Sequence, residues 1–177
     1  PPQKYQQDRT RDDFQFDAAQ QHAVKQLQRL YDDFCQQEPT KQSFWQKLTG
    51  QKIQPRPLQG LYFWGGVGRG KTYLVDTFYE CLPTNRKLRI HFHRFMHKVH
   101  EELTALAGQQ DPLELVADSF KQQTDIICFD EFFVSDITDA MILGTLMQAL
   151  FARGITLVAT SNIEPDGLYK NGLQRAR

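Results

Sequence analysis

The feature that most constrains the fold of this chain is the segment at residues 65–72, Gly-Gly-Val-Gly-Arg-Gly-Lys-Thr. It fits the pattern G-x-x-x-x-G-K-[ST] of a phosphate-binding P-loop. Its four glycines allow backbone angles with φ > 0, so successive N–H groups can turn inward toward an anion. An apolar run at Leu61–Trp64 precedes the motif, and residues 72–79 have apolar side chains at helical spacing. We therefore expect a buried strand, a glycine-rich turn and a helix, in that order.

The last residues of the motif have the chemistry that nucleotide phosphates require. Lys71 supplies a mobile positive charge for the β- and γ-phosphates, and the Thr72 hydroxyl is suited to ligate Mg²⁺. The N-terminus of the following helix adds a positive dipole end. Arg69 is expected to face solvent or a neighbouring subunit. The predicted nucleotide-binding residues are Gly65, Gly66, Val67, Gly68, Arg69, Gly70, Lys71, Thr72 and Tyr73.

Two acids follow a second apolar run. Residues 126–129 suit a strand that is covered on both faces, and Asp130 and Glu131 come directly after it. An acid at the tip of such a strand can face a P-loop across the crevice where open α/β sheets bind ligands. We predict that Asp130 holds the Mg²⁺ shell, directly or through water, and that Glu131 orients and deprotonates the attacking water. The competing interpretation is an acidic pair that merely caps a strand; the P-loop makes it the weaker one.

Further polar residues complete a predicted hydrolytic site. Asn162 ends the next strand and is placed to hydrogen-bond the γ-phosphate or the attacking water, although a polar residue there is often only a turn starter. Arg175 is the preferred candidate for an arginine finger that reaches the γ-phosphate of a neighbouring subunit, with Arg177 and Arg153 as alternatives. A solvated surface arginine is the competing interpretation for each. The guanine-specific motif N-K-x-D is absent, which favours ATP over GTP.

The alternation of strand and helix patterns predicts an α/β fold with a parallel sheet flanked by helices. We expect two regions, residues 1–54 and residues 55–177. The first contains a polar arm and an amphipathic helix whose apolar stripe packs on the P-loop region, a partner-binding helix being the alternative. The expected elements are an arm at 1–16, helices at 17–37, 41–48, 72–79, 95–106, 112–120, 136–151 and 165–173, a linker at 51–59, and strands at 61–64, 88–93, 126–129 and 155–160.

Composition argues against several classes of function. Lys+Arg and Asp+Glu are both 21, so no overall field attracts nucleic acid or an anionic membrane, and nucleic acid is not the expected partner. The three cysteines lack CxxC spacing, which predicts neither a disulfide framework nor a thiolate zinc site. No apolar run approaches the roughly 18 residues of a membrane span. The four histidines between residues 91 and 100 lack an obvious ligand to complete a zinc shell, so zinc is not predicted.

The chain resembles the ZapE family of AAA+ ATPases. The resemblance lies in residues 60–72, His91–Met96, residues 129–132, residues 158–162 and residues 168–173. It implies that Lys71 and Thr72 are the Walker A pair, that Asp130 and Glu131 are the Walker B pair, and that Asn162 is sensor 1.

The same resemblance implies a role in the cell. It implies a cytoplasmic ATPase of bacterial cell division that acts on the tubulin-like ring protein FtsZ and is recruited to the division site; mitochondrial relatives are linked to protein quality control. The family continues past Arg177 into the rest of the core and a helical lid. We expect this chain to be trimmed at both ends and to lack the lid.

Three hypotheses follow. The leading one is an ATP hydrolase that acts on a protein partner and assembles as a homo-oligomer through the nucleotide interface. The second is a nucleic-acid-associated AAA+ protein of the helicase-loader type, which the neutral charge balance disfavours. The third is a nucleotide-gated adaptor without significant turnover, which the acid at Glu131 disfavours.

Overall fold

The computed structural model describes residues 18–36, 58–66 and 70–167. Within these ranges a single sheet of parallel strands has the order β1-β4-β3-β2. The strands are β1 (Leu61–Trp64), β2 (Lys87–His91), β3 (Ile126–Asp130) and β4 (Thr156–Ser161). The helices are α2 (Ala18–Gln36), α4 (Lys71–Cys81), α5 (Phe92–Ala105), α6 (Pro112–Gln123) and α7 (Ile137–Ala152), with a short 3₁₀ turn at Pro165–Gly167. The predicted arm, the helix at 41–48 and most of the linker lie outside the described residues.

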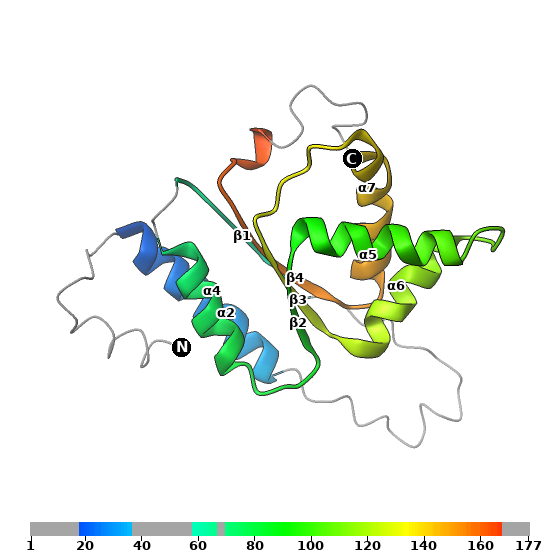
Figure 1. Cartoon of the computed structure of the whole chain (residues 1–177). Helices are drawn as coiled ribbons and strands as arrows, with labels where there is room; N and C mark the ends of the chain where they lie inside the picture. Colours follow the sequence, from blue (N-terminus) through cyan, green and yellow to red (C-terminus); the bar gives the residue numbers. More distant parts are fainter. Residues whose placement is uncertain (1–17, 37–57, 67–69, 168–177) are drawn as a thin grey trace, which may run out of the picture.

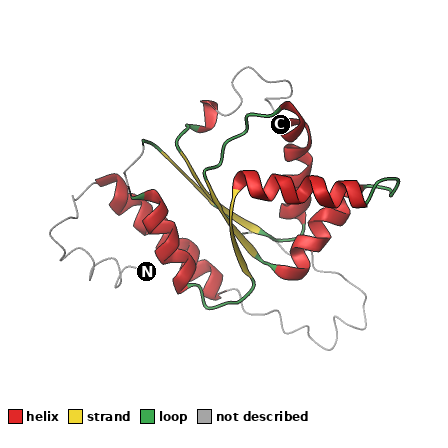
Figure 2. Ribbon diagram, viewed as in Figure 1, coloured by secondary structure: helices red, strands yellow, loops and turns green. Residues whose placement is uncertain are grey.

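Helices cover both faces of the sheet. Figures 1 and 2 show α2 and α4 on one side and α5, α6 and α7 on the other. After β1 the chain crosses by α4 to the far edge at β2, and it then returns strand by strand to β4, which lies beside β1. The strand order reverses at this point, and ligands of open α/β sheets bind at the carboxyl ends of the strands there.

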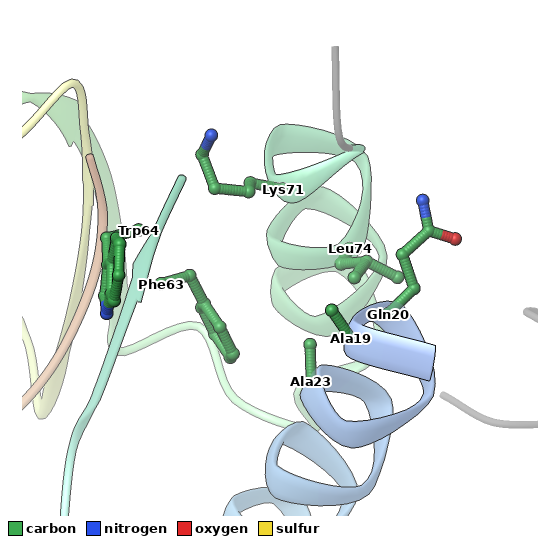
Figure 3. Close-up of a pocket in the computed structure, with 7 residues that line it drawn as sticks. All are labelled: Ala19, Gln20, Ala23, Phe63, Trp64, Lys71 and Leu74. Atoms are coloured by element: carbon green, nitrogen blue, oxygen red, sulfur yellow. The ribbon is translucent and has the colours of Figure 1, made fainter. Parts of the chain in front are cut away.

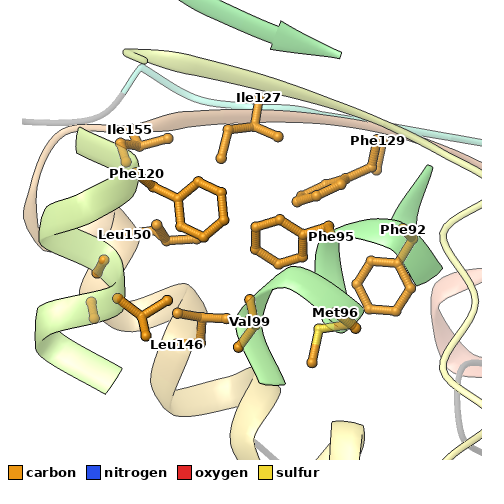
Figure 4. Packing of buried hydrophobic residues seen from close by; sticks show 14 of the residues in the cluster. Phe92, Phe95, Met96, Val99, Phe120, Ile127, Phe129, Leu146, Leu150 and Ile155 are labelled. Atoms are coloured by element: carbon orange, nitrogen blue, oxygen red, sulfur yellow. The ribbon is translucent and has the colours of Figure 1, made fainter. Parts of the chain in front are cut away.

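The side chains of β3 alternate between two hydrophobic clusters. Ile127 and Phe129 belong to the cluster under α5, α6 and α7, while Ile126 and Cys128 belong to the cluster under α2 and α4. Figure 4 shows the first cluster, in which the ring of Phe95 lies 4.8 Å from that of Phe129 between ring centroids. A strand that is buried on both faces requires a continuous apolar run, so the prediction for β3 is confirmed.

The helix predicted at 17–37 is α2, and its apolar stripe packs on the P-loop side of the sheet. Ala23, Leu27 and Leu30 are buried in the same cluster as Leu74 and Phe78 of α4. The expectation that this stripe packs on the P-loop region is confirmed. The boundary predicted near residue 54 stays a prediction.

The boundary between β2 and α5 differs from the prediction. The strand was expected to run to His93 and the helix to begin at Phe95, but β2 ends at His91 and α5 begins at Phe92. The buried residues Phe92, Phe95, Met96 and Val99 show the reason, because their spacing is already helical from Phe92 onward. The apparent strand alternation at 92–93 was therefore the first turn of an amphipathic helix.

The ends of two later helices differ in how they are capped. Asp136 caps α7, since its side chain accepts hydrogen bonds from the N–H groups of Thr138 and Asp139 at 2.6 and 3.4 Å. Gly154 follows the end of α7 with φ of 75°, the left-handed conformation that is common just after a helix. Asp111 does precede Pro112 at the start of α6, but it has a left-handed φ of 51° and makes no side-chain cap.

Of two smaller predictions, the first needs correction and the second lies mostly outside the described residues. β1 was expected to be buried. In the described part of the chain it pairs only with β4, and its last residue, Trp64, is 54% exposed. The helix predicted at 165–173 is described only at Pro165–Gly167, where it is a 3₁₀ turn. β1 approaches β4 closely at its start, where a Cβ on Gly60 would overlap the carbonyl oxygen of Leu157.

Candidate functional site

The P-loop lysine is bound to the turn that precedes it. Gly70 has a left-handed φ of 69°, which turns the chain into α4, and Lys71 is the first residue of that helix. The Lys71 Nζ donates hydrogen bonds to the carbonyl oxygens of Gly65 and Gly66 at 2.6 and 2.8 Å. The ammonium group is therefore held over the mouth of the turn. The predicted binding residues Val67, Gly68 and Arg69 lie outside the described residues.

Asn162 meets the same ammonium group from the neighbouring strand. It directly follows β4, and its Oδ1 accepts a hydrogen bond from Lys71 Nζ at 3.4 Å. The loop after β4 is fixed to the loop after β3, because Ser161 Oγ donates to the carbonyl oxygen of Phe132 at 2.7 Å. The structure thus brings together two predicted site residues that are 91 positions apart in the chain.

Asp130 is held by an arginine that the sequence analysis did not single out. Arg89 of β2 donates from Nε and Nη2 to the two carboxylate oxygens of Asp130, at 2.9 and 2.8 Å. Its Nη1 also forms an ion pair with Asp76 of α4. Burial by itself lowers the pKa of the Arg89 guanidinium, but the hydrogen bonds and charge of Asp130, with the charge of Asp76, outweigh it and raise that pKa.

Strand alternation explains why these three groups meet. Leu88 and Ile90 face the cluster under α5, α6 and α7, so Arg89 points to the opposite face, where α4 lies. Asp130 lies on that same face, because it is two residues after Cys128. A buried arginine there needs acidic partners, which is the signal in the sequence that could have revealed the contact.

Glu131 turns out of the line of β3. Its φ is 51°, and the next residue, Phe132, donates its N–H to the carbonyl oxygen of Thr160 at 2.8 Å. Glu131 therefore forms a bulge at the strand end, and its side chain is 76% exposed. His91 Nδ1 lies 4.0 Å from Glu131 Oε2. The acid is presented to solvent at the carboxyl edge of the sheet, where a base that activates water must be.

One hollow is lined in part by Lys71, and another in part by its hydrogen-bond partner Asn162. The larger, of about 540 Å³, is lined by His93, Glu131, Phe132, Phe133, Ser135, Ser161, Asn162 and Ile163. The smaller, of about 80 Å³, is lined by Lys71 with residues of α2, β1 and α4, and Figure 3 shows Phe63 turned toward α2 while Trp64 lies on the other side of β1. The predicted base Glu131 and the predicted sensor Asn162 thus share one pocket, of a size usual for ligand sites.

The residues present fit a nucleotide with Mg²⁺. A lysine, a left-handed glycine and a helix N-terminus at one turn are the chemistry that phosphates select. The Thr72 hydroxyl and the Asp130 carboxylate are hard oxygen donors. Within the described ranges no three His, Cys, Asp or Glu side chains form a metal-binding group.

Of the remaining candidates, Arg153 lies apart from this site, and two arginines lie outside the described residues. Arg153 follows α7 and is bound to α6, where its Nε contacts Asp118 at 2.6 Å and its Nη1 contacts Glu114 at 2.7 Å. It lies at the amino ends of the strands, opposite the P-loop, so it is not part of the candidate site. Arg175 and Arg177 lie outside the described residues. Of the histidines, His97 lies 3.5 Å from Glu101 and His100 lies 2.6 Å from Asp139.

Comparison with known proteins identifies the family. The model of the AFG1-like ATPases matches residues 1–177, the whole chain. The chain belongs to the AFG1-like ATPase family.

Two curated relatives indicate how much of a family member is present. The chain is 60% identical over 169 residues to the cell division protein ZapE of Escherichia coli K12, which covers 91% of this chain and 45% of ZapE. It is 47% identical over 134 residues to lactation elevated protein 1 homolog B of Danio rerio, which covers 70% of this chain and 27% of that protein. The chain thus spans less than half the length of these two relatives.

Solved structures support the fold class. Domain III of the Thermotoga maritima replication initiation protein DnaA aligns with a TM-score of 0.58 and 16% identity, over 92% of this chain and 59% of that one. DnaI aligns with a TM-score of 0.56 and 18% identity, over 90% and 77%. AMPPCP-bound DnaA of Aquifex aeolicus aligns with a TM-score of 0.56 and 13% identity, over 88% of this chain and 43% of that one. The predicted fold, an α/β P-loop NTPase of the AAA+ type, is confirmed.

None of the helices in the described part of the chain is long and apolar enough to cross a membrane.

Proposed function

We propose that this chain is the nucleotide-binding part of a Mg²⁺-dependent ATP hydrolase. The observation that supports this most directly is the contact between Lys71 Nζ and Asn162 Oδ1, 3.4 Å apart. It joins a cation of the P-loop to an amide at the end of β4. The two acids that end β3, Asp130 and Glu131, lie at the same edge of the sheet. Membership of the AFG1-like ATPase family supports the same activity.

In the proposed reaction, ATP bound with Mg²⁺ supplies the terminal phosphoanhydride bond that water cleaves. Lys71 exchanges the carbonyl oxygens of Gly65 and Gly66 for phosphate oxygens, so its charge offsets the negative charge of the transferred group. Glu131 accepts a proton from the attacking water at a carboxylate oxygen. The Oδ1 of Asn162 accepts from Lys71, which leaves its amide nitrogen to donate toward the phosphate or the water.

The wider role follows by analogy with the relatives. The chain is proposed to act in bacterial cell division in the cytoplasm, on the ring protein FtsZ, as the resemblance to ZapE suggests. Assembly of a homo-oligomer through the nucleotide interface is proposed, with Arg175 of one subunit acting on the nucleotide of the next. Phe133, and Ile137 and Met141 of α7, are exposed large apolar side chains that such a contact would cover.

The first test measures ATP turnover as a function of protein concentration. Glu131→Gln should lower turnover by about 10²- to 10⁴-fold while ATP binding persists, because the variant loses only the proton acceptor. Arg175→Ala should lower turnover at high concentration without weakening ATP binding. Glu101→Gln on the exposed side of α5 is the matched control and should behave as the wild type.

Two outcomes would replace the proposal with one of its alternatives. Wild type and Glu131→Gln that both bind ATP and are equally inactive would favour a nucleotide-gated adaptor. Binding of single-stranded DNA that weakens steeply with salt would favour the helicase-loader type, to which the solved structure of the DnaC helicase loader gives a similarity of fold alone.

A further inference from the structure

Arg89 occupies a position that connects both elements expected to supply protein ligands to Mg²⁺. Thr72 belongs to α4 and Asp130 ends β3. Asp76 lies one helical turn after Thr72, so the two side chains share a face of α4. Arg89 pairs with Asp76 on one side and with Asp130 on the other. One guanidinium group therefore ties α4 to β3 directly beside the candidate metal site.

The contact with Asp130 constrains that carboxylate strongly. Two parallel N–H···O bonds of 2.9 and 2.8 Å fix both its position and its plane. The Arg89 side chain is 16% exposed and the Asp130 side chain 14%, so bulk water competes little for either group. Each carboxylate oxygen keeps a further lone pair for a water molecule or a metal ion.

We propose that Arg89 is a positioning residue for the metal site: it holds the Asp130 carboxylate in the orientation that receives Mg²⁺ or a Mg²⁺-bound water. The proposal builds on the proposed ATPase function. The positive charge of Arg89 does not make the site repel a cation. Asp76 and Asp130 carry two negative charges against the one positive charge of Arg89, so the net charge of the three groups is negative. Arg89 thus acts as the hydrogen-bonded outer support that metal ligands commonly have.

The same two strands offer a matched control at their other end. Arg86, just before β2, donates from Nε to Asp125, just before β3, at 2.7 Å. This pair also joins the β2 and β3 segments, but it lies at the amino ends of the strands, opposite the P-loop. Arg86→Met removes a strand-joining arginine without touching the candidate metal site.

The experiment titrates Mg²⁺ into protein that carries a fluorescent, non-hydrolysable ATP analogue, starting from EDTA. The measured quantity is the Mg²⁺ concentration at the midpoint of the fluorescence change, called the Mg²⁺ midpoint below. Arg89→Met should raise it by about 10- to 100-fold, the usual effect of removing the hydrogen-bonded support of a metal ligand. Binding of the analogue in EDTA should be unchanged. Arg89→Lys keeps the positive charge but cannot make the two parallel hydrogen bonds to Asp130, so it should give an intermediate midpoint. Arg86→Met should keep the wild-type midpoint.

Other outcomes would overturn the proposal. A wild-type midpoint in Arg89→Met, or an equal shift in Arg86→Met, would make Arg89 a merely structural residue. A lowered midpoint would mean that Arg89 competes with the metal for Asp130. If Arg89→Met fails to fold in circular dichroism, the midpoint of Arg89→Lys decides between the same results. Failure of the wild type to bind the analogue with Mg²⁺ present would instead refute the proposed function.

Discussion

At the scale of single residues, Glu131 combines a functional position with an unfavourable backbone. Its φ of 51° lies in the left-handed region, which costs a residue with a Cβ roughly 1–2 kcal/mol. The neighbouring hydrogen bond from Phe132 to Thr160 maintains this conformation. Such strain is typical of functional sites, where the surrounding structure imposes it. The bulge turns the acid toward the pocket that it shares with Asn162.

This strain gives a prediction about stability. Glu131→Gly should be more stable than Glu131→Gln by up to about 1 kcal/mol, because glycine adopts φ of 51° without a steric penalty, although both variants lose the carboxylate. Glu101 lies on the exposed surface of α5, where the order should be the opposite. Glu101→Gly should be less stable than Glu101→Gln by about 1 kcal/mol, since glycine is a poor helix former. Urea unfolding monitored by circular dichroism measures both differences. The same order at the two positions would contradict the strain argument.

At the scale of elements, an ionic contact joins the starts of β2 and β3. Asp125 accepts hydrogen bonds from Arg86 Nε at 2.7 Å and from Lys121 Nζ at 2.6 Å. Burial alone raises the pKa of the Asp125 carboxyl, but the hydrogen bonds from Arg86 and Lys121 outweigh burial and lower that pKa below its ordinary value of 3.8. The ionised form is therefore the one that the folded state stabilises.

The direction of this shift fixes the pH dependence. A lowered pKa in the folded state contributes stability that is fully present above pH 3.8 and is lost as the pH falls through the lower folded value. Asp125→Asn should cost about 1–3 kcal/mol at neutral pH, since it removes hydrogen bonds to a charged acceptor. The difference from wild type should shrink below pH 3.8, as measured by urea unfolding across an acid series. A difference that is constant with pH would exclude the ionic account.

At the scale of the whole molecule, β3 connects two hydrophobic layers. Its alternate side chains enter the cluster of α5–α7 and the cluster of α2 and α4, so the two sides of the sheet share one strand. Loss of packing on either face removes support from β3, and with it from Asp130 at the strand end. We therefore expect the described part of the chain to unfold as one cooperative unit that includes α2.

A core substitution in α2 tests this expectation. Leu30 is fully buried between α2 and α4, so Leu30→Ala should lower the free energy of unfolding by about 2–5 kcal/mol. Lys25→Ala, on the exposed side of the same helix, should change it by less than about 0.5 kcal/mol. Circular dichroism and tryptophan fluorescence should report the same transition. Separate melting of α2 in the wild type would show that it is an appendage.

The sequence by itself determined the elements that depend on local order. These elements include the apolar run of β3 and the apolar stripe of α2. Both follow from the spacing of side chains that are close in the sequence. The boundary of β2 could not be predicted well, because two or three residues of alternation are compatible with both a strand end and a first helical turn.

Only the tertiary structure decided what surrounds the acids at the end of β3. Arg89 and Asp130 are 41 residues apart, and Lys71 and Asn162 are 91 apart. Their contacts exist because parallel pairing aligns β2 with β3 and because β4 lies between β3 and β1. Strand order depends on how the connections between strands pack on the sheet, which brings together residues that are far apart in the sequence. The left-handed bulge at Glu131 depends in the same way on the bond between Phe132 and β4.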